Sequence, residues 1–387
     1  MAWHSPKLEL EQFPSLRWDE VTPGASAQIR GALDRVLEHQ DGGCLTDAEK
    51  YSLAHSEGAD LLALLVAANE LRRELAGNIV SYVVNRNINF TNICFVGCKF
   101  CAFSRGPREA DSYFHSLEDM GRKAKEAWDL GATEVCIQGG LPHGLPPFYY
   151  RDILRAVKNA VPGMHIHAFS PMEMAYGVEL TGMPLRDYLT MLRDNGLDTL
   201  PGTAAEILDD EVRHVLSRNK LSSAQWQEVI RTAHSCGIPS TSTLMYGHME
   251  TPDHWVRVHQ NTLLFQQGLA RPGPTLAEHL KIHALARILL AGSIHNIQVS
   301  WVKLNRKLSQ LCLHAGANDY GGTLMEENIS REAGATAGQY TSAEDFQSLI
   351  LEIGRIPAER NTTYSRMQIK LPVESMTSEW ALVPEFA

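Results

Sequence analysis

"TEVCIQGGLPHGLPPFYYRDILRAVKNAVPGMHIHAFS", residues 133–170, contains the pattern that decides the fold. Its two ends, 133–140 and 164–170, are short runs of apolar or β-branched residues, whereas the stretch between them has the pattern of an amphipathic helix. Similar short runs, with helical stretches between them, recur at 87–93, 197–202, 240–247 and 296–304. Strands that alternate with helices indicate parallel strands joined by crossover helices. We therefore expect an α/β protein, most economically a (β/α) TIM-type barrel.

Several helix boundaries can also be read from the sequence. Gly77 follows the helical stretch "GADLLALLVAANELRRELA" and is a suitable C-terminal cap. Ser116 precedes another helical stretch as an N-terminal cap. Capping boxes, in which a hydroxyl residue is followed three positions later by Glu or Gln, are predicted at Ser222 with Gln225, Thr275 with Glu278, and Thr341 with Glu344.

These patterns divide the chain into three parts. Residues 1–80 form an N-terminal helical extension, 81–340 the barrel core, and 341–387 a C-terminal helix and tail. The expected strands start near 134, 165, 198, 240 and 297, so the last interval is much longer than the others. Two helical stretches, 253–267 and 275–292, fill that interval and only "GLARPGP" joins them. We therefore expect one barrel strand to be missing between 268 and 275.

Composition narrows the class of protein. Of the 387 residues, 44% are hydrophobic, which is enough for a large core, and the formal net charge is −10. The negative charge argues against binding to nucleic acid or to an anionic membrane. The sequence has no apolar run long enough to span a bilayer and no pattern of a signal peptide. Its seven cysteines fit a reducing compartment better than a set of disulfides, so we expect a cytoplasmic enzyme.

Three of these cysteines lie close together in "NFTNICFVGCKFCAFSRG", residues 89–106. Cys94, Cys98 and Cys101 follow the expected strand at 87–93, in a loop at the end where barrel enzymes place their active sites. Three thiolates on a cluster of four irons leave one iron open, and S-adenosylmethionine (SAM) can chelate it. Zinc is the alternative. It would need a fourth ligand from elsewhere, such as Cys136 or one of the sixteen histidines.

The longer stretch "YVVNRNINFTNICFVGCKFCAFSR", residues 82–105, resembles the radical SAM superfamily. It is most similar to the branch that contains the deazaflavin-cofactor synthases and their menaquinone-pathway relatives. The resemblance extends through "IQGGLPHGLPPFYY", "HIHAFSPMEM", "PGTAAEILDDEVR", "TSTLMYGHMET", "NIQVSWVKL" and "GGTLMEENISREAGA". It implies a barrel of the radical SAM kind that uses a 4Fe-4S cluster and SAM.

The resemblance and the residue pattern together suggest site residues. The metal ligands are Cys94, Cys98 and Cys101. Cofactor binding is expected from an aromatic residue in the cysteine loop and from two turns that end strands: Phe100, Gln138, Gly139, Gly140, Pro201, Gly202 and Thr203. Substrate binding is expected from alternating asparagines and a late glycine turn: Asn85, Asn87, Asn89, Gly322, Thr323 and Glu327. The catalytic candidates are His167, Glu173, Tyr246 and His248, and His165 shares a strand face with His167.

The resemblance further implies a reaction of coenzyme F(420) biosynthesis. A 5′-deoxyadenosyl radical would cleave tyrosine between its α and β carbons, and the 4-hydroxybenzyl fragment would join 5-amino-6-(D-ribitylamino)uracil. The expected partners are these small molecules, an electron donor and the second radical SAM subunit of the deazaflavin pathway. Two alternatives remain open: a futalosine-type enzyme of menaquinone biosynthesis, and a catalytically inactive iron–sulfur protein.

Overall fold

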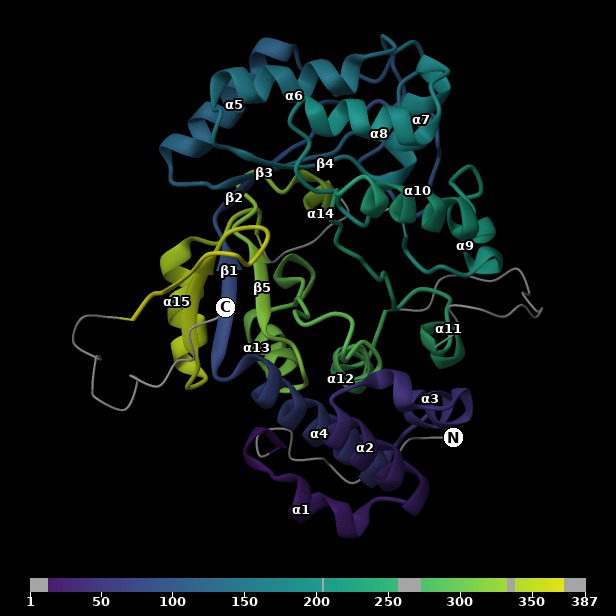
Figure 1. Cartoon of the computed structure of the whole chain (residues 1–387), viewed down its shortest axis with the longest axis vertical. Coiled ribbons are helices and arrows are strands. Elements are labelled where there is room, and N and C mark those ends of the chain that lie inside the picture. The colour runs from purple at the N-terminus through teal and green to yellow at the C-terminus, as the bar shows by residue number, and fades with distance from the viewer. Residues whose placement is uncertain (1–12, 204, 257–272, 333–337, 372–387) are drawn as a thin grey trace.

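The computed structural model describes residues 13–203, 205–256, 273–332 and 338–371. Its N-terminal part is helical from residue 13 to residue 76 and lies at one end of the molecule (Figure 1), and the first strand begins at Ile79, within the predicted extension 1–80. Gly77 caps the longest of these helices, as expected. The elements are η1 (Phe13–Ser15), α1 (Trp18–Val21), η2 (Thr22–Gly24), α2 (Ala27–His39), η3 (Gly42–Cys44), α3 (Asp47–Ala54) and α4 (Gly58–Ala76).

A parallel three-stranded sheet follows, in the order β2–β3–β4. Its strands are β2 (Asn85–Ile88), β3 (Glu134–Ile137) and β4 (His165–Ala168). Single parallel bridges continue this run of strands, from His167 to Thr199 and from Leu200 to Ser240. The predicted strand at 240–247 is therefore reduced to one bridge at its first residue, and the stretch after it is a loop.

A second sheet has the order β5–β1–β6–β7. β1 (Ile79–Val83) runs almost directly into β2, and β5 (Asp319–Gly322) pairs with it in parallel. A bridge from Arg86 to Met325 carries this pairing on to β2, so the two sheets form one curved wall. The predicted strand at 296–304 is also reduced, to a bridge between Gln298 and Asp319 that precedes η4 (Trp301–Lys303).

The strand predicted to be missing between 268 and 275 lies largely outside the described residues. The structure describes only 273–275 of that stretch, and these residues form no strand. In the described part of the chain the parallel wall runs from Ser240 at one edge to Gln298 at the other. The predicted helix at 253–267 is described only at its start, as α11 (Pro252–Val256).

The remaining helices cover the outside of this wall, and most lie between successive strands in the chain (Figure 1). The predicted caps at Ser116, Ser222 and Thr275 are confirmed, each with its reciprocal partner three residues later. The helices are α5 (Leu117–Asp129), α6 (Tyr149–Ala160), α7 (Pro171–Thr181), α8 (Leu185–Asp194), α9 (Asp210–Leu216), α10 (Ser223–Ser235), α12 (Leu276–Leu289), α13 (Arg306–His314) and α14 (Asn328–Glu332). None of the helices in the described ranges is long and apolar enough to cross a bilayer.

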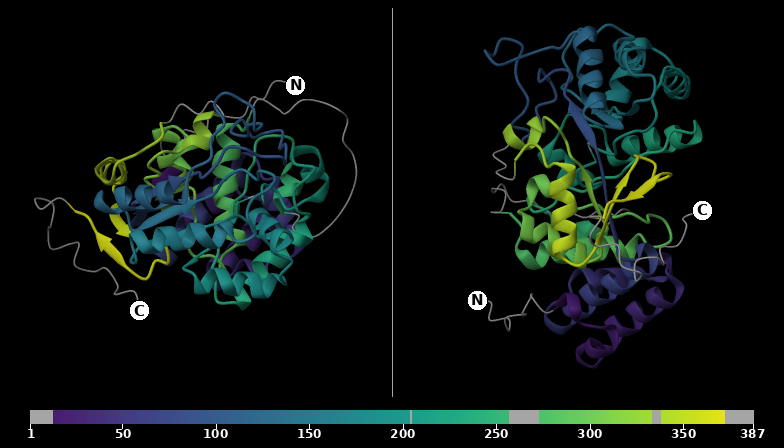
Figure 2. Two further views of the ribbon diagram at one scale, coloured as in Figure 1. Left: turned by 90° about the horizontal axis from the view of Figure 1, so that it is seen from above. Right: turned by 90° about the vertical axis from the view of Figure 1, so that its left-hand side faces the viewer.

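The C-terminal part contains more than the predicted helix and tail. α15 (Ala343–Glu352) begins one residue later than expected, because Ser342 is its cap instead of Thr341. The chain then forms β6 (Ile356–Arg360) and β7 (Met367–Ile369), an antiparallel hairpin where the sequence pattern predicts only a tail (Figure 2, right). β6 pairs in parallel with β1, which attaches the hairpin to the barrel wall.

Candidate active site

The three predicted cluster ligands lie in the loop that follows β2. Cys94, Cys98 and Cys101 are half-buried and form no disulfide. The loop is held closed by backbone hydrogen bonds, from the Cys94 N–H to the Arg105 carbonyl (3.1 Å) and from the Cys101 N–H to the Cys98 carbonyl (3.2 Å). Among the described residues, no three Cys, His, Asp or Glu side chains gather closely enough to be the ligands of one metal ion.

The surroundings of these thiols fit a cluster with several metal corners. Burial raises the pKa of the Cys98 thiol to about 11, and the charges of Cys94 and Cys101 act in the same direction. Lys220 acts against this shift. The three sulfurs are therefore near enough to repel one another as thiolates, and bound iron would supply the positive charge that keeps them deprotonated. A cubane binds each thiolate at a separate iron, so its ligands lie farther apart than those of a single ion.

The predicted QGG turn packs directly against the cysteine loop. The Gly140 N–H donates to the Thr91 carbonyl (2.8 Å), and the Phe95 N–H donates to the Leu141 carbonyl (3.0 Å). A Cβ at Gly140 would overlap the Ile93 carbonyl, and one at Gly139 would overlap the Phe90 ring. Both glycines are therefore required for the turn to approach the cysteine loop so closely.

Glu173 holds this turn from behind. It lies at the start of α7, is almost completely buried, and accepts hydrogen bonds from the Gly139 N–H (3.1 Å) and from the Ser170 N–H (2.7 Å) and hydroxyl (2.6 Å). Burial raises its pKa to about 7, although these hydrogen bonds favour the charged form. Predicted as catalytic, Glu173 has the contacts of a residue that positions the QGG turn.

The second predicted cofactor turn meets the first one. The Thr203 hydroxyl donates to Oε1 of Gln138 (3.2 Å), so the two turns lie side by side. The Gly202 N–H donates to the Thr241 hydroxyl (2.9 Å), and a Cβ at Gly202 would overlap the Thr241 backbone. Pro201 is buried at the start of this turn. The structure thus brings together the cysteine loop and both turns.

Polar side chains form two layers across the strands. In the first layer, Asn85 lies beside Glu134, and Glu134 lies beside His165. Two residues further along each strand, Asn87, Cys136 and His167 lie side by side and form the second layer. His165 and His167 share one strand face, as predicted, because both bond the Thr199 hydroxyl, at 2.8 and 2.7 Å. Burial lowers the pKa of both histidines, which favours neutral rings.

Asn85, Gly322 and Thr323 join β5 to β2. The Asn85 Nδ2 donates to Glu134 (2.7 Å), and its Oδ1 accepts the Leu324 N–H (2.9 Å). The Thr323 hydroxyl donates to the Asn85 carbonyl (2.9 Å) and accepts its N–H (3.0 Å). A Cβ at Gly322 would overlap the Asn85 amide. These three residues are predicted to bind substrate, but in the structure they connect the two strands. Asn85 and Thr323 do so by hydrogen bonds, and Gly322 does so by leaving room for the Asn85 amide.

Asn87 and Asn89 are placed differently. The Asn87 Nδ2 donates to Glu327, which also accepts the Ser330 N–H (2.8 Å), and the Asn89 Nδ2 donates to the Gln138 carbonyl (3.1 Å). The Oδ1 atoms of both asparagines are buried and have no hydrogen-bond partner. A buried acceptor without a donor is costly, so these two atoms point to a missing ligand.

Three predicted residues lie apart from this group. Tyr246 bonds Nδ1 of His279 on α12 (2.9 Å), and His248 bonds the Met245 carbonyl (2.9 Å) and lies 3.1 Å from Glu250. Phe100 packs against a small apolar cluster formed by Ile207, Val212 and Leu216, with the Lys220 Nζ 5.1 Å from its ring centroid. These contacts all lie outside the His167 layer, and the predicted roles of the three residues remain predictions.

Two residues of the site were missed by the sequence reasoning. Glu134 belongs to the first polar layer and is buried, with Asn85 and Thr362 on its two oxygens. A carboxylate at the start of an otherwise apolar strand was the available signal. Lys220 faces Cys98 and forms an ion pair with Glu206 (2.6 Å). It lies far along the chain from the cysteines, in a loop without a recognisable motif.

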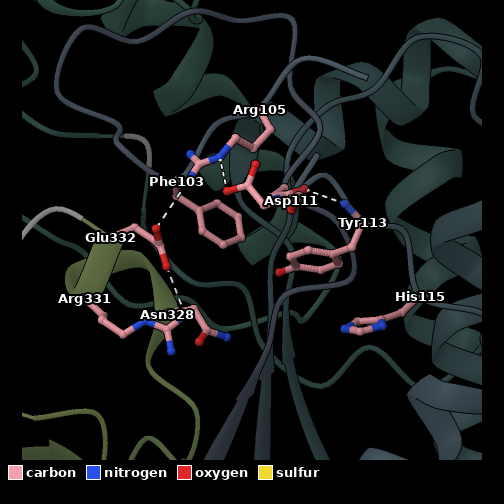
Figure 3. Close-up of a pocket in the computed structure, with 9 residues that line it drawn as sticks. Phe103, Arg105, Asp111, Tyr113, His115, Asn328, Arg331 and Glu332 are labelled. Carbon is pink, nitrogen blue, oxygen red and sulfur yellow. Dashed lines mark hydrogen bonds and ion pairs between the residues drawn. The ribbon is translucent and has the colours of Figure 1, made fainter. Parts of the chain in front are cut away.

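A separate cavity of about 310 Å³ opens between the far end of the cysteine loop and α14 (Figure 3). Arg105 bonds Asp111 (2.7 Å) and Glu332 (3.2 Å) at its edge, and the Phe103 and Tyr113 rings line it. None of the site residues predicted from the sequence lines this cavity. The charged side chains that line this cavity form ion pairs with one another. None of the residues of the two polar layers lines it.

Family models match most of the chain. The model of the "Radical SAM superfamily" matches residues 88–260, and the model of the "CofH/MqnC C-terminal region" matches residues 251–373. The first match contains the three cysteines and both turns. The second contains Gly322, Thr323 and Glu327.

Curated relatives are similar over nearly the whole chain. The FO synthase of Mycobacterium leprae is 45% identical over 386 residues, which cover 94% of this chain and 44% of that protein. The 5-amino-6-(D-ribitylamino)uracil–L-tyrosine 4-hydroxyphenyl transferase of Methanothermobacter thermautotrophicus is 43% identical over 363 residues, covering 88% of this chain and 99% of that protein. The chain thus spans less than half the length of the FO synthases that it matches.

Two solved structures share the fold. The FeFe-hydrogenase maturase HydG from Carboxydothermus hydrogenoformans has a TM-score of 0.62 at 16% identity, covering 92% of this chain and 86% of that chain. Methylornithine synthase (PylB) has a TM-score of 0.56 at 19% identity, covering 84% and 97%. At these identities the likeness concerns the fold alone, and it supports the barrel predicted from the strand and helix pattern.

Proposed function

The chain belongs to the radical SAM superfamily, and on that premise we propose that it transfers the 4-hydroxybenzyl group of L-tyrosine to 5-amino-6-(D-ribitylamino)uracil in coenzyme F(420) biosynthesis. One observation carries the proposal: the cysteine loop and the QGG turn meet just beyond the ends of β2 and β3, next to the polar layer of Asn87, Cys136 and His167. The similarity over 99% of the methanogen transferase supports this substrate pair over a futalosine derivative.

Cys94, Cys98 and Cys101 would hold a 4Fe-4S cluster. When bound, the cluster and SAM supply a one-electron cleavage of a carbon–sulfur bond that yields a 5′-deoxyadenosyl radical. The protein's own part is to place SAM. Gly139 and Gly140 give backbone access beside the cysteines, and Thr203 lies next to Gln138 to define the other side of the same turn.

The polar layers would hold the substrates. His167 is buried and neutral, so it can accept or donate one hydrogen bond without bringing charge into the site. Asn87, Asn89 and Glu327 lie on the neighbouring strands. Packed side chains around these layers exclude water, which would otherwise quench a reactive intermediate.

Further partners are part of the proposal. Because the FO synthases are more than twice as long as the matched region, we infer that a second protein or domain completes the deazaflavin ring system. An electron donor must reduce the cluster. The half-buried cysteine loop is the natural place for such a donor to approach.

Anaerobic reconstitution with iron and sulfide, followed by measurement of 5′-deoxyadenosine, tests the proposal. Release should rise when tyrosine and the diaminouracil are both added, and a futalosine derivative should not raise it. A rise with the futalosine derivative alone would favour the menaquinone alternative. A bound cluster without any 5′-deoxyadenosine, with a strong reductant present, would favour an inactive iron–sulfur protein.

A further inference from the structure

Asn87 and Asn89 each have one amide group that the protein does not use. Both Oδ1 atoms are buried and unpartnered. The orientation of each amide is fixed by its other contact, because the Glu327 carboxylate and the Gln138 carbonyl can only accept hydrogen bonds. The NH₂ group must therefore face those partners, and the oxygen must be the free atom.

The two asparagines lie on the same side of one chain segment, and their NH₂ groups bind Glu327 and the Gln138 carbonyl. Asn87 is in β2 and Asn89 follows it two positions later, so their side chains are about 7 Å apart along an extended backbone. A ligand that satisfies both must carry at least two hydrogen-bond donors spaced across a small molecule. Asn85, earlier on the same face, has no such role, since Glu134 and the Leu324 N–H occupy both ends of its amide.

The charge of the surroundings selects among possible ligands. The two polar layers consist of Asn85, Glu134, His165, Asn87, Cys136 and His167, and none of these residues is a lysine or an arginine. The charge of Arg360 acts on Glu134 and His167, but its guanidinium is already bound to the Asp319 carboxylate. A free amino acid would bring a carboxylate that needs a cationic partner. Two neutral amide oxygens instead suit the N–H groups of an uncharged heterocycle.

Building on the proposed function, we propose that Asn87 and Asn89 form the recognition site for the diaminouracil, each accepting a hydrogen bond from one of its N–H groups. Tyrosine would bind elsewhere. The site distinguishes the uracil from its partner substrate by presenting only acceptors at these two positions.

Calorimetric titration of the cluster-loaded protein with 5-amino-6-(D-ribitylamino)uracil, without SAM or reductant, tests the assignment without requiring turnover. Asn87→Leu and Asn89→Leu keep the side-chain volume and remove the amide, both its free acceptor and its donor to Glu327 or to the Gln138 carbonyl. Each should weaken binding about tenfold, the usual effect of losing one hydrogen bond to a buried group. Asn195→Leu is the matched control at the end of α8, where Met191 and Arg155 already occupy both ends of the amide. It should bind as the wild type does.

Wild-type affinity in both folded leucine variants would overturn the inference. So would an equal loss of affinity for tyrosine, which would indicate general distortion, or an absence of diaminouracil binding by the wild type. If a leucine variant unfolds, the smaller Asn87→Ser and Asn89→Ser replace it with the same expectation. Failure of the proposed function is a separate result, because it appears as missing 5′-deoxyadenosine in the wild type.

Discussion

At the scale of single residues, the geometry of the candidate site depends on hydrogen bonds between its own residues. Glu173 shows this best. Its carboxylate accepts the Gly139 N–H and caps α7 through Ser170, so one buried side chain fixes both a turn and a helix. The sequence predicts Glu173 near the substrate, but only the structure shows that the QGG turn bonds one of its oxygens and Ser170 the other.

Glu173→Gln should weaken SAM binding about tenfold while leaving the iron content unchanged. The amide has one oxygen, so it cannot accept from both Gly139 and Ser170, and the turn loses one anchor. Equilibrium binding of SAM to the cluster-loaded protein measures this. The control is Glu179→Gln, exposed on the same helix, which should bind normally. Unchanged SAM affinity in the Glu173 variant would contradict the positioning role.

Cys98→Ala should abolish the brown colour and most of the bound iron while the fold remains. Two thiolates hold a four-iron cluster poorly, whereas the half-buried position leaves the core intact. Iron analysis and circular dichroism provide the two readings. Cys44→Ala, in the N-terminal helical part, is the control and should retain iron. Normal iron content in the Cys98 variant would refute the ligand assignment.

His283 gives a prediction about pH. It is buried in α12, donates to the His279 carbonyl (2.7 Å), and burial lowers its pKa from 6.5 to about 4. The unfolded chain therefore binds a proton between those pH values that the folded chain does not. The contribution to stability is complete above pH 6.5 and is lost as the pH falls toward 4, by on the order of 3 kcal/mol.

Denaturant unfolding of the wild type and of His283→Gln at pH 7 and pH 4.5 tests this statement. Glutamine keeps a donor for the His279 carbonyl but does not titrate. The variant should lose less stability between the two pH values than the wild type. An identical loss in both proteins would show that His283 does not contribute.

At the scale of elements, hydrogen-bonded caps were easier to predict than strands. The box at Ser222 and Gln225 depends on two residues three positions apart, so the sequence alone shows it. The strand at 240–247 depends on pairing with a neighbouring strand, and in the structure it pairs with Leu200 at Ser240 alone. β6 contains Pro357, which lacks an N–H, so its sequence is more typical of the tail after a helix than of a strand. β6 is a strand because it pairs with β1 and β7. β1 is distant in the sequence, and β7 has only three residues, too few to show a clear strand pattern.

The hairpin of β6 and β7 should be fixed by one buried ion pair. Arg360 on β6 bonds Asp319 on β5, at 2.6 and 3.0 Å, and both side chains are buried. Arg360→Leu leaves the carboxylate buried with only hydroxyl and N–H donors, so it should cost about 3 kcal/mol of stability. Lys370→Ala breaks the more exposed pair with Glu359 on the same hairpin and should cost less than about 1 kcal/mol. Equal effects in denaturant unfolding would contradict this ranking.

At the scale of the whole molecule, the N-terminal helices and the cysteine loop lie at different ends (Figure 1). α4 packs against α12, so the helical extension supports the barrel from the side away from the predicted site. Barrel architecture and the cysteine loop followed from the sequence because alternating elements and ligand spacing are local patterns. The sequence does not predict which asparagines are free to bind a ligand, because that depends on contacts across strands, such as those of Asn85 with Glu134 and Leu324.

The central claim is that three thiolates of this chain support radical cleavage of tyrosine and transfer of its benzyl carbon. The most direct measurement uses anaerobically reconstituted protein, SAM, a reductant, the diaminouracil and tyrosine labelled with ¹³C at the β carbon. Mass spectrometry should find the label bonded to the uracil ring, with 5′-deoxyadenosine formed alongside it. A protein that carries zinc and takes up no iron, or one that forms 5′-deoxyadenosine while the label never reaches the uracil, would contradict the claim.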